Sequence, residues 1–215
     1  MTPPLLSTAY LPSVAYMAVL ARHGSVAIEQ KETFPKQTFR NRAAIATGNG
    51  VLMLNVPVVR PHGNHTRTEQ IILSYNEPWH VRHWRAIVAA YSAAPYFLYY
   101  RDELEQILMQ RHDRLLDLND TLLHYLLKKF KINCQITYTD TFTPPSPTDL
   151  RTLLTDKHTL PILNSQFSIF NSQFPSYSQV FDTRLGFLPN LSAIDLLFNL
   201  GPEAKQLLLQ TTPSL

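Results

Sequence analysis

The residues best suited to chemistry in this chain gather in one short basic stretch, residues 34–42. Within these nine positions stand two aromatic side chains, two amides and three cations, the cations being Lys36, Arg40 and Arg42. The guanidinium group of arginine pairs in a bidentate manner with carboxylates and phosphates, and the amide of Asn41 can add a hydrogen bond in the same plane. The stretch therefore predicts a site for an anion, either a ligand or a buried carboxylate of the protein itself.

Asp195 is the carboxylate that best fits an internal pairing of this kind. It lies in the apolar run 191–198, so we expect its side chain to be at least half-buried. A buried carboxylate without a partner is costly, and arginine is its usual partner. Two interpretations of Arg40 and Arg42 stay open and are compatible, because one arginine can anchor Asp195 while the other binds a ligand phosphate.

Two residues are candidates for catalytic proton transfer, Glu29 and His83. Glu29 ends a predicted strand just before the basic stretch, where a carboxylate could act as a general base. The alternative is a salt bridge to Lys31 or Lys36, although an exposed pair of that kind contributes only ~0–1 kcal/mol to stability. His83 stands beside Trp84 and is expected either to face a cleft or to pack its ring.

Metal and cofactor chemistry finds less support in the sequence. Two His-x-x-His pairs occur, His62 with His65 and His80 with His83, but no cysteine or acidic residue has the spacing of a third ligand, so no metal site is predicted. Cys134 is predicted to be a core thiol. The chain has neither a Gly-x-Gly-x-x-Gly nor a Walker motif, which disfavours a Rossmann cofactor or an ATP site and leaves any cofactor unknown.

The elements that must position these residues indicate an α/β fold, with a mixed, largely parallel sheet flanked by helices and a C-terminal helical or irregular segment. Short apolar runs between turn residues predict strands, and apolar residues at helical spacing predict helices. The run 51–59 reads as a central strand covered on both faces, and an Ala-rich turn of helix is predicted before Gly48. The predicted strands cover residues 5–10, 26–29, 51–59, 70–74 and 134–138, and the predicted helices cover 13–22, 78–95, 103–111, 113–130, 192–200 and a last one from 202.

We expect a single domain over residues 1–215, because this length and a hydrophobic content of 45% suffice for one sizeable core. Within it, residues 1–140 are expected to form the α/β core, and 191–215 to form helices that pack back on it. Residues 141–190 read as a loop-rich, lid-like segment, since long stretches without periodicity are more often functional loops than packing elements.

Charge and composition indicate which kind of ligand the protein binds and in which cellular compartment it is found. Residues 1–101 hold ten Lys or Arg against four Asp or Glu, whereas residues 102–215 hold nine against twelve. This asymmetry fits an anionic small molecule better than nucleic acid, because no long basic stripe or groove-reading motif is present. A single cysteine and the lack of an apolar window of about 18 residues predict a cytoplasmic protein without a membrane span. Self-association into a homo-oligomer stays open.

A series of short segments with distinctive residues follows in order along nearly the whole chain. They are Leu6-Ser7-Thr8-Ala9-Tyr10-Leu11-Pro12, Lys36-Gln37-Thr38-Phe39-Arg40-Asn41-Arg42, Val56-Pro57-Val58, Trp79 with His83-Trp84, Pro95-Tyr96-Phe97, Pro189-Asn190-Leu191-Ser192-Ala193-Ile194-Asp195-Leu196-Leu197-Phe198-Asn199 and Gly201-Pro202-Glu203. In combination these segments resemble the WbqC-like family of bacterial proteins, and in particular a subgroup found in Bacteroidetes-like bacteria. No single segment is specific, whereas the ordered set is.

The resemblance implies a role in bacterial surface-polysaccharide (O-antigen-type) biosynthesis, as a sugar-modifying transferase. Under this hypothesis the basic stretch holds an activated anionic donor or a nucleotide-sugar, and Glu29 or His83 moves the proton. Many members of the family end their first strand in His-Gln-Pro, where this chain has Leu6, Ser7 and Thr8. That departure favours the alternative hypothesis of a non-catalytic ligand-binding or assembly protein of the same pathway.

Overall fold

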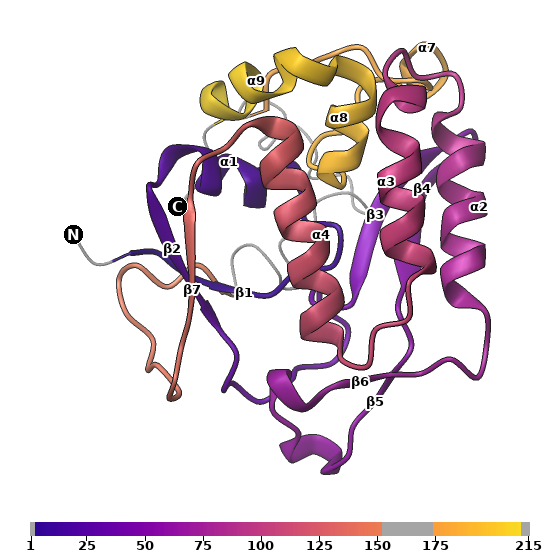
Figure 1. The fold of residues 1–215 in the computed structure, drawn as a ribbon. Coiled ribbons are helices and arrows are strands. Elements are labelled where there is room, and N and C mark those ends of the chain that lie inside the picture. Colours follow the sequence, from indigo (N-terminus) through magenta and orange to yellow (C-terminus); the bar gives the residue numbers. More distant parts are fainter. Residues whose placement is uncertain (1–2, 152–173, 212–215) are drawn as a thin grey trace.

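The computed structural model describes residues 3–151 and 174–211 of the chain, and one part of the fold is a parallel sheet. Strand β2 lies in its middle, between β1 and β7, and both neighbours run parallel to it (Figure 1). The helix α1 connects the first two strands and begins at Ser13, whose hydroxyl accepts the N–H of Tyr16 as an N-cap. The bounds are β1 (Leu5–Ser7), α1 (Val14–Arg22), β2 (Ser25–Glu29) and β7 (Gln135–Tyr138).

The remaining helices surround this sheet and two small antiparallel pairs of strands. Helices α8 and α9 contact α1, and α8 also packs on α3 and α4 (Figure 1). The longer helices are α2 (Trp79–Tyr91), α3 (Phe97–Met109), α4 (Leu115–Phe130), α8 (Ala193–Leu200) and α9 (Ala204–Gln210), and the short ones are η1 (Gly63–His65), η2 (Thr68–Gln70), α7 (Asp182–Leu185) and η5 (Gly201–Glu203). The prediction of a mixed α/β fold with a parallel sheet and helical C-terminal segment is thereby confirmed.

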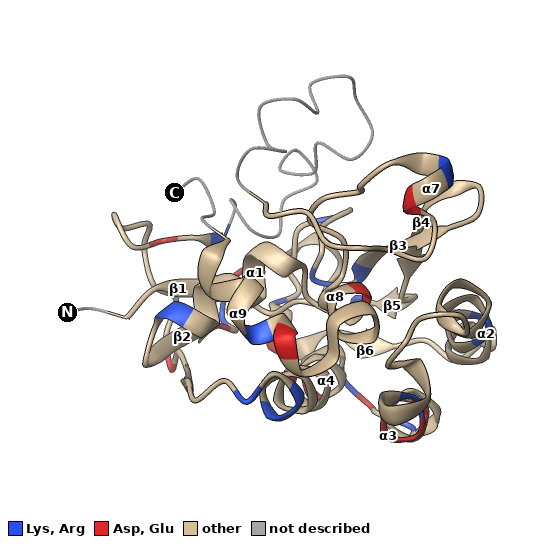
Figure 2. Ribbon diagram, turned by 90° about the horizontal axis from the view of Figure 1, so that it is seen from above, with Lys and Arg blue, Asp and Glu red and all other residues tan. Residues whose placement is uncertain are grey.

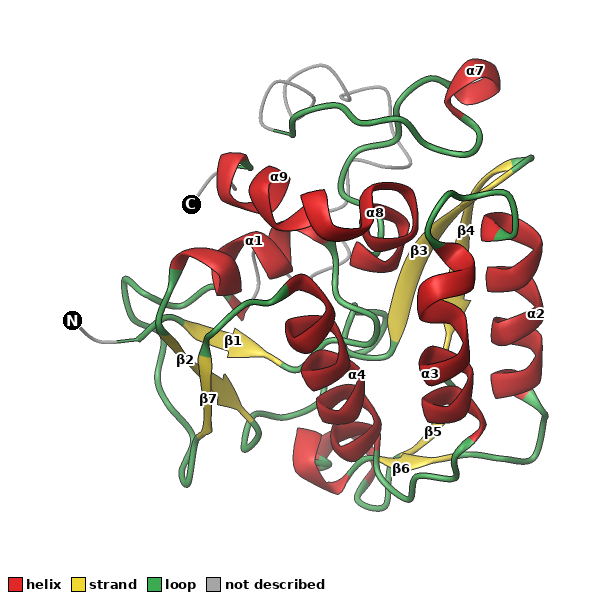
Figure 3. Ribbon diagram, turned by 45° about the horizontal axis from the view of Figure 1, so that its top comes forward, coloured by secondary structure: helices red, strands yellow, loops and turns green. Residues whose placement is uncertain are grey.

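The segment after the basic stretch folds differently from the prediction. It forms a hairpin of β3 (Arg42–Thr47) and β4 (Gly50–Asn55), whose strand β3 contacts α2 (Figure 3), so the predicted Ala-rich helical turn is wrong. Helix propensity is a weak preference that tertiary packing overrides, and here the small side chains let the α8 segment approach closely. The backbone N–H of Ser192 donates to the carbonyl of Ala44 at 2.8 Å.

The predicted central strand 51–59 is also wrong, because the run is divided. Strand β4 is a partly exposed arm of the hairpin, with Leu52 39% exposed. The chain then passes Pro57 and pairs again as β5 (Val58–Val59) with β6 (Ile72–Leu73). Proline lacks a backbone donor, which explains why the ladder is interrupted there.

Charged residues of both signs lie on α3 and α4, as Figure 2 shows. Lys128 and Lys129 of α4 both pair with Glu103 of α3, so these charges join the two helices. Within the described residues, no helix is long and apolar enough to cross a membrane.

Candidate functional site

The basic stretch does not form a single cluster in the folded protein. Lys36 is exposed on a turn, whereas Arg40 is buried in the interior. Asn41 is also buried and precedes β3, and Arg42, which is half-buried, begins that strand. The stretch therefore supplies one solvated cation, one internal cation and two residues at the start of the hairpin.

Arg40 belongs to a buried polar cluster at the carboxyl end of β1. Its guanidinium forms a bidentate pair with Glu32, with Nε at 2.8 Å from Oε1 and Nη2 at 3.0 Å from Oε2. Nη2 also donates to the Ser7 hydroxyl, which in turn donates to Oε1 of Glu32 at 2.8 Å. All three residues are at most 8% exposed. Arg40 is thus an internal anchor whose partner, Glu32, the sequence did not single out.

Asp195 is fully buried as expected, but its expected arginine partner is not there. Its Oδ1 accepts the hydroxyl of Tyr177 at 2.7 Å and the amide of Gln179 at 3.0 Å. Among the described residues no cation contacts this carboxyl, because Arg40 is committed to Glu32. Burial raises the pKa of Asp195 above its ordinary value, and the hydrogen bonds from Tyr177 and Gln179 oppose that rise only in part.

Glu29, the predicted general base, is also locked in the interior, at the end of β2. It is 0% exposed, and neither Lys31 nor Lys36 forms the expected salt bridge with it. Its carboxylate accepts the backbone N–H groups of Lys31 at 2.7 Å and Thr143 at 2.8 Å, and lies 3.6 Å from Arg151. These bonds fasten the loop after β7 to the sheet, so proton transfer by Glu29 would require several of them to open.

His83, the other predicted proton carrier, lies in the wall of a pocket. Its ring is 7% exposed, and Nδ1 lies 3.0 Å from the hydroxyl of Tyr10. Burial lowers the pKa of His83 to about 4, which a hydrogen bond to the backbone of Asn55 partly opposes and the nearby charge of Arg82 reinforces. The imidazole is therefore neutral at physiological pH.

The Tyr10 hydroxyl is the hydrogen-bonding partner of the His83 ring at Nδ1. Burial raises the pKa of Tyr10 above its ordinary value, which keeps that hydroxyl protonated and able to donate to the neutral imidazole. The bond to Tyr10 must therefore break before Nδ1 of His83 can act as a base.

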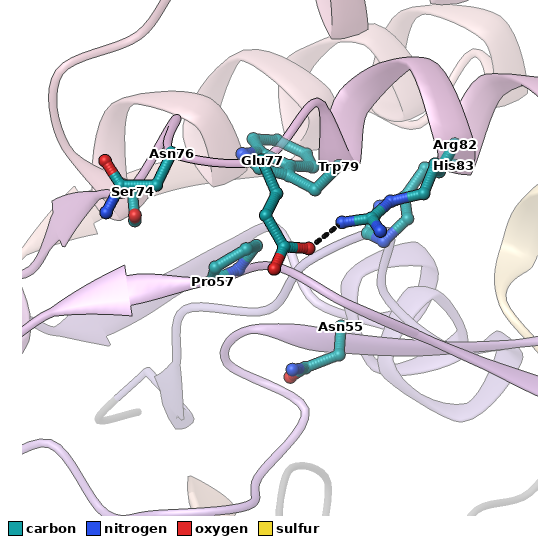
Figure 4. A pocket seen from close by; sticks show the side chains of 8 residues that line it. All are labelled: Asn55, Pro57, Ser74, Asn76, Glu77, Trp79, Arg82 and His83. Atoms are coloured by element: carbon teal, nitrogen blue, oxygen red, sulfur yellow. Dashed lines mark hydrogen bonds and ion pairs between the residues drawn. The ribbon is translucent and has the colours of Figure 1, made fainter.

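The pocket lies between the first turns of α2 and the end of β4, with a volume of about 500 Å³ (Figure 4). This volume falls within the range of small-molecule sites, ~300–1,000 Å³. Its wall combines one indole, one cation, one carboxylate, amides, a hydroxyl and a proline. The lining residues are Asn55, Pro57, Ser74, Asn76, Glu77, Trp79, Arg82 and His83.

Asn55 connects this pocket to the basic stretch. Its side-chain oxygen accepts the amide of Asn41 at 3.3 Å and Nε of Arg42 at 3.3 Å. Asn41 is further fixed by donating to the carbonyl of Val56 at 2.9 Å. Of the predicted site residues, only His83 lines the pocket, whereas Asn41 and Arg42 are bonded to the lining residue Asn55. Glu29, Lys36, Arg40 and Asp195 contact none of the lining in this way and lie outside it.

Two polar groups at the pocket have unused hydrogen-bonding capacity. The indole Nε1 of Trp79 is buried without an acceptor among the described residues. The side chain before α2 provides no cap, because the N-cap position is Pro78, and no acidic residue stands in the first turn. Helix N-termini carry unpaired N–H groups and a partial positive charge, which favours anions.

Several pocket residues escaped the sequence analysis. Arg82 reads from the sequence as an outward-facing residue of a helix, and Asn55 and Asn76 carry no motif. A clue was available in the polar turn Asn76-Glu77-Pro78, which places hydrogen-bonding side chains just before a strong helix that contains His83. The convergence with β4 depends on the hairpin, which the sequence analysis predicted wrongly.

The histidine pairs show no metal-binding arrangement in the described part of the chain. No group of three or more His, Cys, Asp or Glu side chains there could hold a metal ion. The second pair is used in aromatic packing instead, since both His80 and His83 contact the ring of Trp79. Cys134 is a free, half-buried thiol, and burial raises its pKa above the ordinary value.

Comparison with known proteins gives a family and one distant relative. The sequence profile of the WbqC-like protein family matches residues 8–160, which include the whole pocket and the basic stretch. An uncharacterized protein of Mycobacterium tuberculosis, Rv1507c, is 26% identical over 225 residues, covering 93% of this chain and 94% of its own length. No solved structure matches the sequence significantly.

Proposed function

This chain belongs to the WbqC-like protein family, and from that premise we propose that it binds the phosphate-bearing part of an activated sugar donor. The proposed site is the pocket between α2 and β4. The proposed role is that of a cytoplasmic transferase in bacterial surface-polysaccharide biosynthesis, with a nucleotide-sugar as its donor. The observation that carries the proposal is a pocket of suitable size that Arg82 and Asn55 line, with Arg42 and Asn41 bonded to the side chain of Asn55.

The chemistry of the lining supports this class of ligand. Arginine pairs well with phosphate oxygens, and Arg82 reaches into the pocket from the second turn of α2 while Arg42 stands behind Asn55. Asn55, Asn76 and Ser74 offer hydrogen bonds to sugar hydroxyls, and Trp79 adds an aromatic side chain to the wall.

In a transfer reaction the same groups would act mainly by position and charge. When a donor bond breaks, negative charge remains on the departing phosphate, and Arg82 would stabilise it. His83 is neutral and bonded to Tyr10, so in this arrangement it serves as part of the pocket wall. A step that uses His83 as a base begins with release of its bond from Tyr10.

Binding is tested by thermal shift and calorimetry with UDP-, GDP-, dTDP- and CMP-linked sugars, pyrophosphate and free sugars. A ligand at ~100 times its dissociation constant adds about 2.7 kcal/mol of stability, which is several degrees in a domain of this size. We expect a nucleotide-sugar and pyrophosphate to shift the melting temperature and free sugars not to.

Arg82→Gln and Arg85→Gln form a matched pair for locating the site. Both arginines lie on α2 and are exposed, but only Arg82 lines the pocket. We expect Arg82→Gln to weaken binding at least tenfold and Arg85→Gln to leave it within twofold. Equal effects of the two substitutions, or a flat screen with folded protein, would overturn the proposal.

A second candidate is a non-catalytic ligand-binding or assembly protein of the same pathway. It is favoured by the hydrogen bonding of Glu29 and His83, which leaves neither predicted proton carrier free in this structure. Phosphorus NMR separates the two, because a transferase releases the nucleoside phosphate when an acceptor glycan is added, whereas a binding protein leaves the donor intact.

A further inference from the structure

Glu77 and Arg82 form an ion pair across the mouth of the pocket. Figure 4 shows the carboxylate and the guanidinium pointing toward each other, above Asn55 and beside Pro57. Both side chains are largely solvent-exposed, at 67% for Glu77 and 58% for Arg82. The pocket's one lining cation is thus already occupied by an anion of the protein.

We propose that Glu77 is a built-in competitor for the anion subsite of this pocket, and that a ligand phosphate displaces it from Arg82. The inference rests on the proposed function, since it assumes that the pocket takes an anionic ligand. It adds a residue, Glu77, that sets which anions bind to Arg82.

The exposed pair contributes little to the fold, which allows it to exchange partners. Ion pairs between solvent-exposed side chains are worth only a few tenths of a kcal/mol in most proteins, because water competes for both groups. The Glu77 side chain does not cap α2, whose N-cap position is Pro78. Within the described residues, the Glu77 carboxylate has Arg82 as its side-chain partner. Because both groups are already in contact with water, separating them leaves no charge buried without a partner.

The ion pair between Glu77 and Arg82 also predicts which class of anion the pocket binds. Among the lining residues the charges of Glu77 and Arg82 cancel, and the His83 ring in the wall is neutral. A singly charged carboxylate would replace Glu77 by a group of the same kind, with no gain in charge. A phosphate dianion or a diphosphate brings more charge and more acceptor oxygens to the guanidinium and to the α2 N-terminus. The site therefore selects phosphate or diphosphate groups over carboxylates.

The test compares pyrophosphate and acetate by calorimetry at low ionic strength, in the full chain and in two single variants. Glu77→Gln removes the competitor, and Glu105→Gln is the control for the same change in net charge. Glu105 lies on α3 outside the pocket lining and pairs only loosely with Arg101, at 3.7 Å. We expect Glu77→Gln to tighten pyrophosphate binding about two- to fivefold, the range that follows from the strength of an exposed ion pair.

The outcomes separate this inference from the proposed function. Tighter pyrophosphate binding in Glu77→Gln alone, with no binding of acetate to the unmodified chain, supports the inference. Pyrophosphate binding that is equal in the unmodified chain and both variants overturns it while the proposed pocket stands. Acetate binding as tight as pyrophosphate overturns the selection for phosphate. Absence of pyrophosphate and nucleotide-sugar binding in every variant overturns both proposals.

Discussion

Arg40 is held by partners inside the protein, although it lies in a basic stretch whose sequence predicts an anion-binding site. It reaches Glu32 and Ser7 in the interior, where water cannot replace either bond. Breaking a buried ion pair by removing one partner leaves the other charge uncompensated, at a cost of about 3–5 kcal/mol. Its role in this account is to hold the chain between β2 and β3 so that Asn41 and Arg42 face Asn55.

We therefore predict that Arg40→Ala lowers the free energy of unfolding by about 3 kcal/mol or more. Lys36→Ala, four positions earlier and exposed, should change it by less than about 0.5 kcal/mol. Urea denaturation of both variants measures the difference. An Arg40→Ala protein of normal stability that had lost ligand binding would show that Arg40 is a ligand clamp instead.

Asp195 gives a second prediction, about the pH dependence of stability. Its pKa is raised by burial, so the folded protein keeps a proton there up to a higher pH than the unfolded chain does. The stability from this site is fully present below the ordinary pKa of aspartate and is lost as the pH rises through the raised pKa. Asp195→Asn should remove this loss, because the amide oxygen can still accept the bonds from Tyr177 and Gln179.

The measurement is the melting temperature of the unmodified protein and of Asp195→Asn between pH 4 and pH 8. We expect the two curves to diverge as the pH rises, with the asparagine variant the more stable at neutral pH. A variant that is destabilised equally at every pH would mean that the carboxylate itself is needed in its charged form.

For individual residues, the sequence allowed candidate site residues to be predicted, but not the residues with which they form bonds. His83, Asn41 and Arg42 could be chosen from residue type and position; His83 lines the pocket, and the other two are bonded to its lining residue Asn55. The partners of Arg40 and Asp195 could not, because each pairing joins segments whose approach is set by tertiary packing. Arg82 and Asn55 look like ordinary surface residues until the hairpin brings β4 beside α2.

At the scale of elements, helices were easier to predict than strands. The predicted helix 113–130 corresponds to α4 within two residues, since its apolar face repeats regularly and it has no competing structure. The hairpin was missed because alanines favour helices in isolation, and because the apolar run 51–59 contains a proline whose effect depends on its neighbours. Short apolar runs leave strand and helix ambiguous without tertiary contacts.

Gly201 gives a prediction about how closely the end of α8 packs against the start of α3. It ends α8 with φ of +52°, and a Cβ placed there would lie 2.5 Å from the ring of Tyr96, which precedes α3. Gly201→Ala is therefore both strained in its backbone and sterically blocked, and we expect a loss of about 1–3 kcal/mol.

Gly24→Ala is the matched control, because a Cβ at Gly24 meets nothing within 4 Å and its φ is not in the left-handed region. Thermal or urea unfolding of the two variants should show a clear loss for the first and a change of less than about 0.5 kcal/mol for the second. Equal stability of the two would contradict the close packing of α8 against the start of α3.

At the scale of the whole molecule, the polar residues separate into an anchoring region and a binding region. The carboxyl ends of parallel strands are where α/β proteins usually place ligands. Here that region holds Glu29, Glu32 and Arg40, which are all buried. Glu32 and Arg40 pair with each other, and Glu29 accepts backbone N–H groups of nearby loops. The open pocket lies instead between the hairpin and α2, so the sheet supports the site without lining it.

The most direct test of this account uses the two tryptophans of the chain as reporters in proton–nitrogen NMR. Trp79 lines the pocket with an indole N–H that has no acceptor within the described residues, whereas Trp84 stacks on Phe97 outside the pocket lining. On titration with pyrophosphate, we predict that the Trp79 indole resonance shifts to saturation while that of Trp84 stays in place. A titration that moves only Trp84, or neither resonance, would contradict a phosphate site in this pocket.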